Sequence, residues 1–179
     1  MGQPLKIHNL LDEFLASDPA EIGCFSVENR NRLFNDLKSC ELTKADLIIV
    51  TCSTLTPAVQ LIRPFINVPI VAIDDAMTEQ AVRIGKKIKV VATAMSTLKP
   101  TIAKLEQEAA LAGVEIEVDA QDHEPAYTAM RAGDMTTHDR LVLEMIREVK
   151  GFDCIVLAQA SMGHLQEKAQ EIAGVPVLA

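Results

Sequence analysis

The chain has 179 residues, a formal net charge of −8, and only 3% aromatic residues, with no Trp and one Tyr. This charge disfavours a phosphate-backbone partner, and the scarcity of aromatic side chains disfavours base stacking, so we expect no nucleic-acid partner. No apolar run reaches the roughly 18 residues that span a bilayer, and the first residues lack a basic segment followed by an apolar one. We therefore expect a cytoplasmic protein with no membrane partner.

Strand-like apolar runs alternate with helical stretches along the chain, which is typical of β–α units on a parallel sheet. The first half predicts helices over 6–16, 29–39 and 57–65, an extended segment over 21–27, and strands over 46–51 and 68–73. The second half predicts helices over 76–85, 97–112 and 136–149, strands over 88–93, 114–118 and 153–158, and a long loop over 119–133. We expect an α/β fold in which helices flank parallel sheets.

The chain also contains an internal repeat. Residues 46–71 align without a gap on residues 153–178, at a constant offset of 107. Each copy has a strand, a small polar turn, a helix and a second strand entered through Val-Pro. This repeat predicts two similar lobes, over 1–75 and 76–179, of which the first lacks an opening strand. Because a missing strand exposes a sheet edge, we expect a homo-oligomer.

Three turns that follow strands are rich in small and hydroxyl residues, and they lie at 51–54, 93–97 and 158–161. Ligands of doubly wound sheets bind beyond the carboxyl ends of the strands. The free N–H groups of a helix N-terminus suit a carboxylate or a phosphate. The same hydroxyls can act as helix N-caps, which requires no ligand.

Cys52 follows an apolar strand and precedes a helix, a position that lowers the pKa of a thiol and favours chemistry, although packing is an alternative. We expect Cys24 and Cys154, in apolar runs, to fill the core, and His8 and His138 to be solvated. The sequence shows neither the short ligand spacing of a metal site nor a glycine-rich phosphate motif. We therefore expect no cofactor and no metal.

The segments VTCSTLTP, IDDAM, VVATAMSTLKPT and VLAQASM resemble the aspartate/glutamate/hydantoin racemase superfamily, from about residue 45 onward. This resemblance implies two pseudo-symmetric α/β lobes with the active-site cleft between them. It also implies cofactor-independent proton transfer by two cysteines at the carbon next to a carboxylate. Cys52 matches the first cysteine, and Gln159 stands at the position of the second. By the same resemblance, the carboxylate-binding positions fall on Ser53, Thr54, Thr93, Thr97 and Ser161.

An amide neither gives nor takes a proton usefully near neutral pH, so Gln159 cannot replace a thiol. Several functions are compatible with one cysteine. Cys52 can transfer protons alone on a small carboxylic or amino acid, reprotonate a carbanion as in the superfamily's decarboxylases, or act as a nucleophile as in its maleate isomerases. A second donor, such as His164 or water, is another possibility. The remaining alternative is a protein that binds a small carboxylate without turnover.

Overall fold

The computed structural model describes residues 4–179 and divides the chain into two compact units. One unit comprises residues up to Ile49 together with Ala58–Val71, and the other comprises Val50–Pro57 and Ala72–Ala179. The segment that carries Cys52 therefore belongs to the second unit. The lobes at 1–75 and 76–179, the cleft between them and the homo-oligomer stay predictions.

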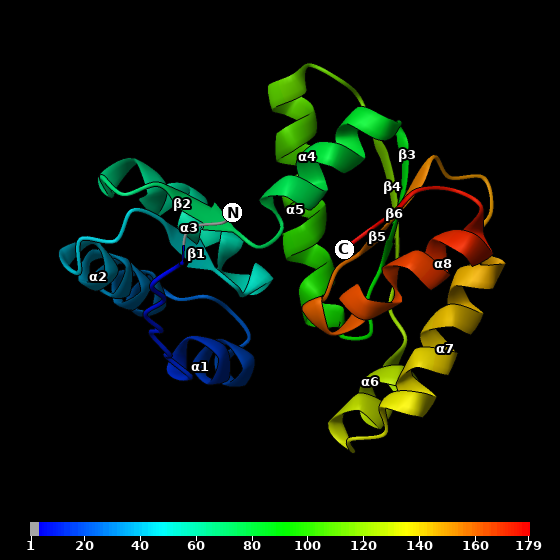
Figure 1. Cartoon of the computed structure of the whole chain (residues 1–179), viewed down its shortest axis with the longest axis horizontal. Coiled ribbons are helices and arrows are strands. Elements are labelled where there is room, and N and C mark those ends of the chain that lie inside the picture. Colours follow the sequence, from blue (N-terminus) through cyan, green and yellow to red (C-terminus); the bar gives the residue numbers. More distant parts are fainter. Residues whose placement is uncertain (1–3) are drawn as a thin grey trace. The chain divides into compact units, whose positions relative to one another are not determined.

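The first half of the chain, blue through cyan to green in Figure 1, contains helices, 3₁₀ turns and two short strands. In chain order they are α1 (Phe14–Ile22), α2 (Val27–Leu42), β1 (Ile48–Val50), η1 (Ser53–Leu55), α3 (Thr56–Ile62), η2 (Arg63–Phe65) and β2 (Ile70–Ala72). The strands β1 and β2 form a two-stranded sheet. Backbone hydrogen bonds from Ile48 N to Pro69 O and from Ile73 N to Val50 O show that the two strands are parallel.

Two predictions for the first residues are wrong. Residues 4–12 form no helix, because Leu5, Ile7 and Leu11 are 73–86% exposed and have no apolar surface to pack against. The segment 21–27 is not extended. Gly23, with φ of 78°, ends α1 in a left-handed conformation, and Ser26 begins α2 with a capping box. Cys24 is consequently exposed and not a core residue.

The second half of the chain forms a four-stranded parallel sheet in the order β4-β3-β5-β6. Its strands are β3 (Lys87–Val91), β4 (Glu117–Gln121), β5 (Cys154–Leu157) and β6 (Val177–Leu178). Its helices are α4 (Asp75–Ile84), α5 (Met95–Ala112), α6 (Glu124–Arg131), α7 (Met135–Glu148) and α8 (Gln166–Ala173), with the 3₁₀ turn η3 (Ala160–Leu165) after β5. The prediction of an α/β fold with parallel sheets and flanking helices is confirmed.

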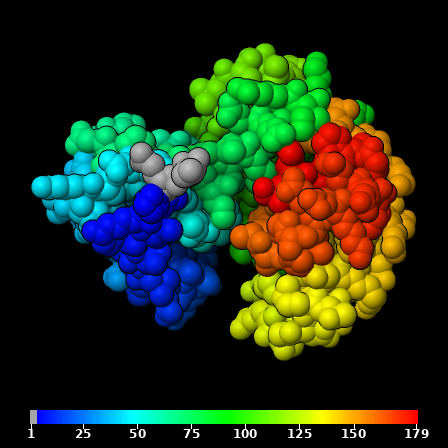
Figure 2. Space-filling view, in the orientation of Figure 1, coloured from blue at the N-terminus to red at the C-terminus, as the bar shows by residue number. Residues whose placement is uncertain are grey.

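Helices cover both faces of the four-stranded sheet (Figure 1), because every central strand carries apolar side chains on both sides. Ile88 and Val156 pack with α4 and α5 in one core cluster. Ile155 and Leu157 pack with α7 and α8 in the other. Figure 2 shows α8, in red, lying directly on α7, in yellow to orange. This burial on both faces is typical of parallel sheets.

The repeat in the sequence is also present in the backbone. The hydrogen bond from Ile48 N to Pro69 O in the first copy has its counterpart, at the same offset of 107, in the bond from Ile155 N to Pro176 O. In each copy a 3₁₀ turn follows the strand and leads into the helix. The turns at 51–54 and 158–161 therefore have similar backbone settings.

Two elements of the second half differ from the prediction. Strand β4 lies three residues later than the expected strand over 114–118, because Gly113 and the next residues form the turn that ends α5. Helix α6 occupies most of the expected loop. It is started by Pro125 in its first turn and by His123, whose Nδ1 accepts a hydrogen bond from Ala126 N at 3.2 Å.

A substitution at Gly85 tests the packing of the segment that joins α4 to β3 against Asp153. A Cβ at this position would overlap the Asp153 side chain, whose Oδ2 accepts hydrogen bonds from Lys86 N at 2.7 Å and Lys87 N at 2.9 Å. We predict that Gly85→Ala lowers the free energy of unfolding by about 1–3 kcal/mol, measured in urea. Gly163→Ala is the control, since an added Cβ there meets nothing within 4 Å. Equal effects of the two substitutions would contradict this account.

Candidate functional site

The Cys52 side chain lies at the turn between β1 and η1. Its residue has an extended backbone, with φ of −123° and ψ of 112°, and it is partly buried. The sulfur lies 2.8 Å from Thr54 Oγ1, and either atom can be the donor. The Cys52 sulfur is therefore in hydrogen-bond contact with a hydroxyl of its own turn.

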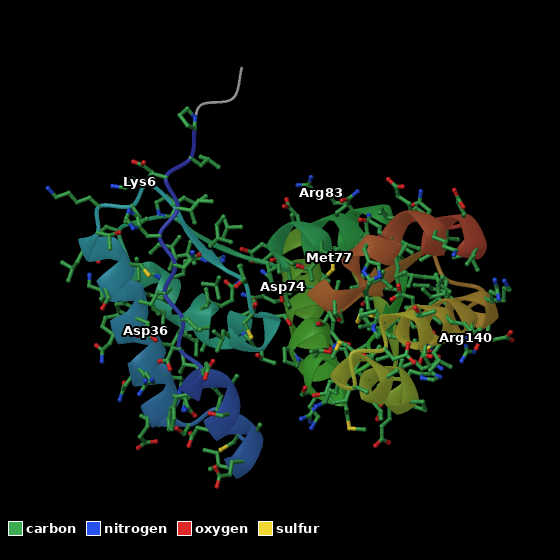
Figure 3. All side chains as sticks on the ribbon, turned by 60° about the horizontal axis from the view of Figure 1, so that its bottom comes forward. Lys6, Asp36, Asp74, Met77, Arg83 and Arg140 are labelled. Carbon is green, nitrogen blue, oxygen red and sulfur yellow. The ribbon has the colours of Figure 1, made fainter. Side chains whose placement is uncertain are left out.

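The Cys52 turn is fixed at its end by a buried pair. Thr56 Oγ1 donates a hydrogen bond of 2.7 Å to Asp74 Oδ1, and both residues are at most 2% exposed. Figure 3 labels Asp74 and Met77 near the start of α4. Burial raises the pKa of the Asp74 carboxyl, and the hydrogen bond from Thr56 offsets part of this rise. The pair anchors the Cys52 segment to the second unit.

Gln159 follows β5, and its side-chain oxygen accepts hydrogen bonds from the turn after the neighbouring strand β3. Its Oε1 accepts from Thr93 N, from Thr93 Oγ1 at 3.0 Å and from Ala94 N at 3.1 Å. Two backbone N–H groups can meet only an acceptor, so the oxygen of the amide must face them. The register explains the contact: Val91 pairs with Leu157, so the residues two positions further on, Thr93 and Gln159, meet at the carboxyl edge.

The other hydroxyls of the predicted site have different surroundings. Thr97 Oγ1 donates to Ala94 O at 2.9 Å, as a hydroxyl does in a first helical turn. Ser161 Oγ is buried and has no hydrogen-bond partner among residues 4–179. The side chain of Ser53 is partly buried. The structure therefore brings Gln159 to Thr93, and Cys52 to Thr54; no hydrogen bond in the described part of the chain links Cys52 with Gln159.

Sequence reasoning missed a histidine–aspartate–histidine group beside η3. Asp139 Oδ1 lies 2.8 Å from His138 Nδ1, and Asp139 Oδ2 lies 2.8 Å from His164 Nε2. The prediction that His138 is solvated is wrong, because this residue of α7 is 0% exposed. The missed signal was the adjacent pair His138-Asp139 at the start of a helix whose N-terminus lies at the carboxyl edge of the sheet.

The remaining cysteines differ from Cys52 in their settings. Cys154 is buried in β5, and burial, with a smaller contribution from Asp153, raises the pKa of its thiol to about 11. Burial also raises the pKa of the Cys40 thiol, with a contribution from Asp36. Neither thiol is therefore suited to form a thiolate near neutral pH. Cys154 fills the core as the sequence predicted.

The chain belongs to the Asp/Glu/Hydantoin racemase family, whose family model matches residues 19–179. Among solved structures, a putative Asp/Glu racemase from Yersinia pestis is similar over 94% of this chain and 75% of its own, with 19% identity and a TM-score of 0.66. Glutamate racemase RacE1 from Bacillus anthracis is similar over 86% of this chain with 16% identity and a TM-score of 0.58, and the chain spans 60% of its length.

A third similar structure is a glutamate racemase from Francisella tularensis in complex with D-glutamate. It has 13% identity and a TM-score of 0.60, over 84% of this chain and 58% of its own. These likenesses show the fold. No curated protein matches the chain significantly. Within residues 4–179, every helix is too short or too polar to cross a bilayer, and no group of three or more His, Cys, Asp or Glu residues is arranged so that it could hold a metal ion.

Gln159→Ala tests the donor cluster. The substitution leaves two backbone N–H groups and a hydroxyl without their acceptor, so we predict a loss of about 1–3 kcal/mol in the free energy of unfolding. Gln107→Ala, at an exposed position of α5, is the matched control and should change stability little. If both variants unfold at the same urea concentration as the parent, Gln159 does not hold the turn.

The Asp139 group predicts a pH dependence. Burial raises the pKa of Asp139, but its hydrogen bonds with His138 and His164 outweigh burial and hold the pKa below its ordinary value. A lowered folded-state pKa stabilises the protein above the unfolded pKa of about 4, and this contribution is lost as the pH falls through the folded-state pKa.

We therefore predict that the parent loses stability on acidification below about pH 4 more steeply than Asp139→Asn does. Unfolding in urea at a series of pH values measures the difference. Glu171→Gln removes an exposed carboxyl from α8 and should follow the parent. Parallel stability curves for the parent and Asp139→Asn would rule out this role of Asp139.

Proposed function

We propose that the protein catalyses cofactor-independent proton transfer at the carbon next to the carboxylate of a small carboxylic or amino acid, with Cys52 as the transferring group. Membership of the racemase family supports the reaction class. The observation that carries the proposal is the pairing of the partly buried Cys52 sulfur with Thr54 Oγ1 at 2.8 Å, at the carboxyl end of β1. A hydroxyl there can stabilise the thiolate that must accept a proton.

Gln159 changes the expected outcome of the reaction. Its amide cannot give or take the proton on the opposite side of the substrate carbon. Cys52 alone can remove a proton and return it to the same face, or deliver a proton to a carbanion formed by loss of carbon dioxide. We therefore expect exchange or one-sided protonation in place of efficient racemisation. A third possibility with one cysteine is that the Cys52 thiol acts as a nucleophile on the substrate, as in an isomerase.

The substrate class rests on binding groups near the turns. The hydroxyl of Ser53 lies beside Cys52 in sequence and offers a donor for a carboxylate, whereas the hydroxyl of Thr54 is paired with the Cys52 sulfur. The hydroxyls of Thr93 and Thr97 are already hydrogen-bonded within the protein, so they can bind a ligand only after rearrangement. The glutamate racemase from Francisella tularensis holds D-glutamate, and the shared fold supports an amino-acid-sized ligand here.

A second candidate is a protein that binds a small ligand without turnover. One observation favours it: the Gln159 oxygen occupies Thr93 N and Ala94 N, the donors that would otherwise face a substrate oxygen. This internal acceptor stabilises the turn whether or not chemistry occurs. Binding that survives Cys52→Ser in the absence of any exchange would support this candidate.

Deuterium exchange tests the catalytic proposal. The protein is incubated in heavy water with a panel of amino acids and dicarboxylic acids, and loss of the α-proton signal is followed by NMR. We expect exchange with at least one compound, and a fall of about two orders of magnitude or more in Cys52→Ala, because a positioned acid–base group contributes that much. Cys24→Ala, at an exposed position between α1 and α2, is the control. Exchange that is insensitive to Cys52→Ala would reject the proposal.

A further inference from the structure

The turn that carries Cys52 ends on a residue that contacts the connection after the neighbouring strand. Thr56 follows the 3₁₀ turn η1, and its Oγ1 donates a hydrogen bond of 2.7 Å to Asp74 Oδ1. The two residues are 18 positions apart in the chain, and they are 1% and 2% exposed. Because both are shielded from water, removal of either one leaves the other without a hydrogen-bond partner.

The pairing of β1 with β2 explains why Asp74 is within reach of this turn. Ile73 N donates to Val50 O, which places Val50 opposite Ala72 in the parallel pair. Cys52 and Asp74 each come two residues further on, so both leave the sheet at the same carboxyl edge. The hydrogen bond of Thr56 therefore joins two neighbouring connections at this edge.

The segment that holds Asp74 is itself fixed from two sides. The next residue, Asp75, accepts a hydrogen bond of 2.8 Å from Ala72 N through its Oδ2. Asp75 Oδ1 also lies 3.0 Å from the Nζ of Lys104, a residue of α5 that is 4% exposed. These contacts attach the end of β2 to α5. Thr56 therefore meets a carboxyl whose position is set by other elements than the Cys52 turn.

The Asp74 carboxyl is a costly group for packing alone. Its Oδ2 is buried and has no hydrogen-bond partner among residues 4–179. A buried carboxyl with an unpartnered oxygen lowers the free energy of unfolding, and a small apolar side chain would avoid this cost. Its Oδ1 meets Thr56, so a role in holding the Cys52 turn gives a reason for a carboxyl at this position.

The equivalent turn of the second copy has no such contact. At the offset of 107, Thr56 corresponds to Gly163, which has no hydroxyl to donate. In that copy the turn is held at its start, where Gln159 accepts from the turn after β3. The contact that Thr56 makes thus belongs to the copy that has the thiol.

We propose that Thr56 and Asp74 are positioning residues for Cys52, and that their hydrogen bond holds the η1 turn in the conformation that keeps the sulfur beside the Thr54 hydroxyl. The proposal rests on the proposed function for the role of Cys52 in proton transfer. It extends that function by assigning control of the thiol geometry to a carboxyl at the start of α4. A small displacement of a positioned group strongly lowers the rate of the reaction that it carries out.

Hydrogen exchange at equivalent amides of the two turns tests this role. Leu55 N donates to Cys52 O, and at the offset of 107 Met162 N donates to Gln159 O. The Leu55 amide therefore reports opening of the Cys52 turn, and the Met162 amide is its matched reference within the same molecule.

Breaking the hydrogen bond from either side should open only the first turn. We expect Thr56→Val to speed exchange at the Leu55 amide about tenfold or more, because loss of a buried hydrogen bond destabilises the closed turn by about that factor. Exchange at Met162 should not change. Asp74→Ala should have the same effect as Thr56→Val, and the double variant should add little, since both substitutions remove one interaction.

Two further variants separate positioning from a general loss of stability. Thr56→Ser keeps the hydroxyl and should preserve slow exchange at Leu55. Thr101→Val removes an equally buried hydroxyl, which donates a hydrogen bond of 2.9 Å within α5, and should leave Leu55 unchanged. The proposal is overturned if Leu55 exchange stays slow when the pair is broken, if Met162 loses protection equally, or if Thr101→Val acts as Thr56→Val does.

The assay of α-proton exchange distinguishes this proposal from the catalytic one. For a compound that the parent exchanges through Cys52, we expect Thr56→Val to slow the exchange about tenfold or more and Thr56→Ser to preserve it. Unchanged exchange in Thr56→Val would overturn the positioning role and leave catalysis by Cys52 intact. If the parent exchanges no compound, the proposed function fails, and the Leu55 amide alone decides whether the pair holds the turn.

Discussion

The amide oxygen of Gln159 joins the carboxyl ends of the two central strands of the larger sheet. Strands β3 and β5 are paired in register from Ile88 with Cys154 to Val91 with Leu157, so Thr93 and Gln159 emerge side by side. Three donors from the β3 turn converge on one oxygen from the β5 turn. Because the start of α5 follows directly, the same contact determines which donors at this edge remain for a ligand.

This contact gives Gln159 a structural role at the edge of the sheet. The chain belongs to the racemase family, and it has a thiol with a hydroxyl neighbour at Cys52. At the second position a side chain without acid–base capacity has a structural role. The chemistry that we propose is therefore one-sided.

Much of the fold followed from sequence periodicity and from the repeat. The strands over 46–51, 88–93 and 153–158 were predicted because apolar β-rich runs end in polar turns, and the hydrogen bonds of Ile48 and Ile155 confirm the equivalence of the two copies. The helix predicted for the first residues was wrong, because an apolar pattern does not show whether side chains such as Leu5 and Ile7 have a surface to pack against. The sequence did not predict helix α6, because its N-cap is His123 and histidine is not among the residues preferred at that position.

The sequence predicted where the residues of the candidate site lie along the chain, but it did not predict which side chains contact one another. Sequence placed Cys52 and Gln159 at equivalent turns, but it could not show that the Gln159 oxygen faces Thr93, since this depends on strand order and register. His138 is buried, and Asp139 links it to His164. These two histidines lie 26 residues apart in the chain, on α7 and η3. Such contacts depend on packing, which a single sequence does not reveal.

Hydrogen exchange at two backbone amides tests the central claim most directly. The N–H groups of Thr93 and Ala94 should exchange slowly in the parent protein, because Gln159 accepts from both. In Gln159→Ala, we predict that both amides lose their protection while the amides within β3 keep theirs. Unchanged protection of Thr93 and Ala94 in this variant would contradict the account.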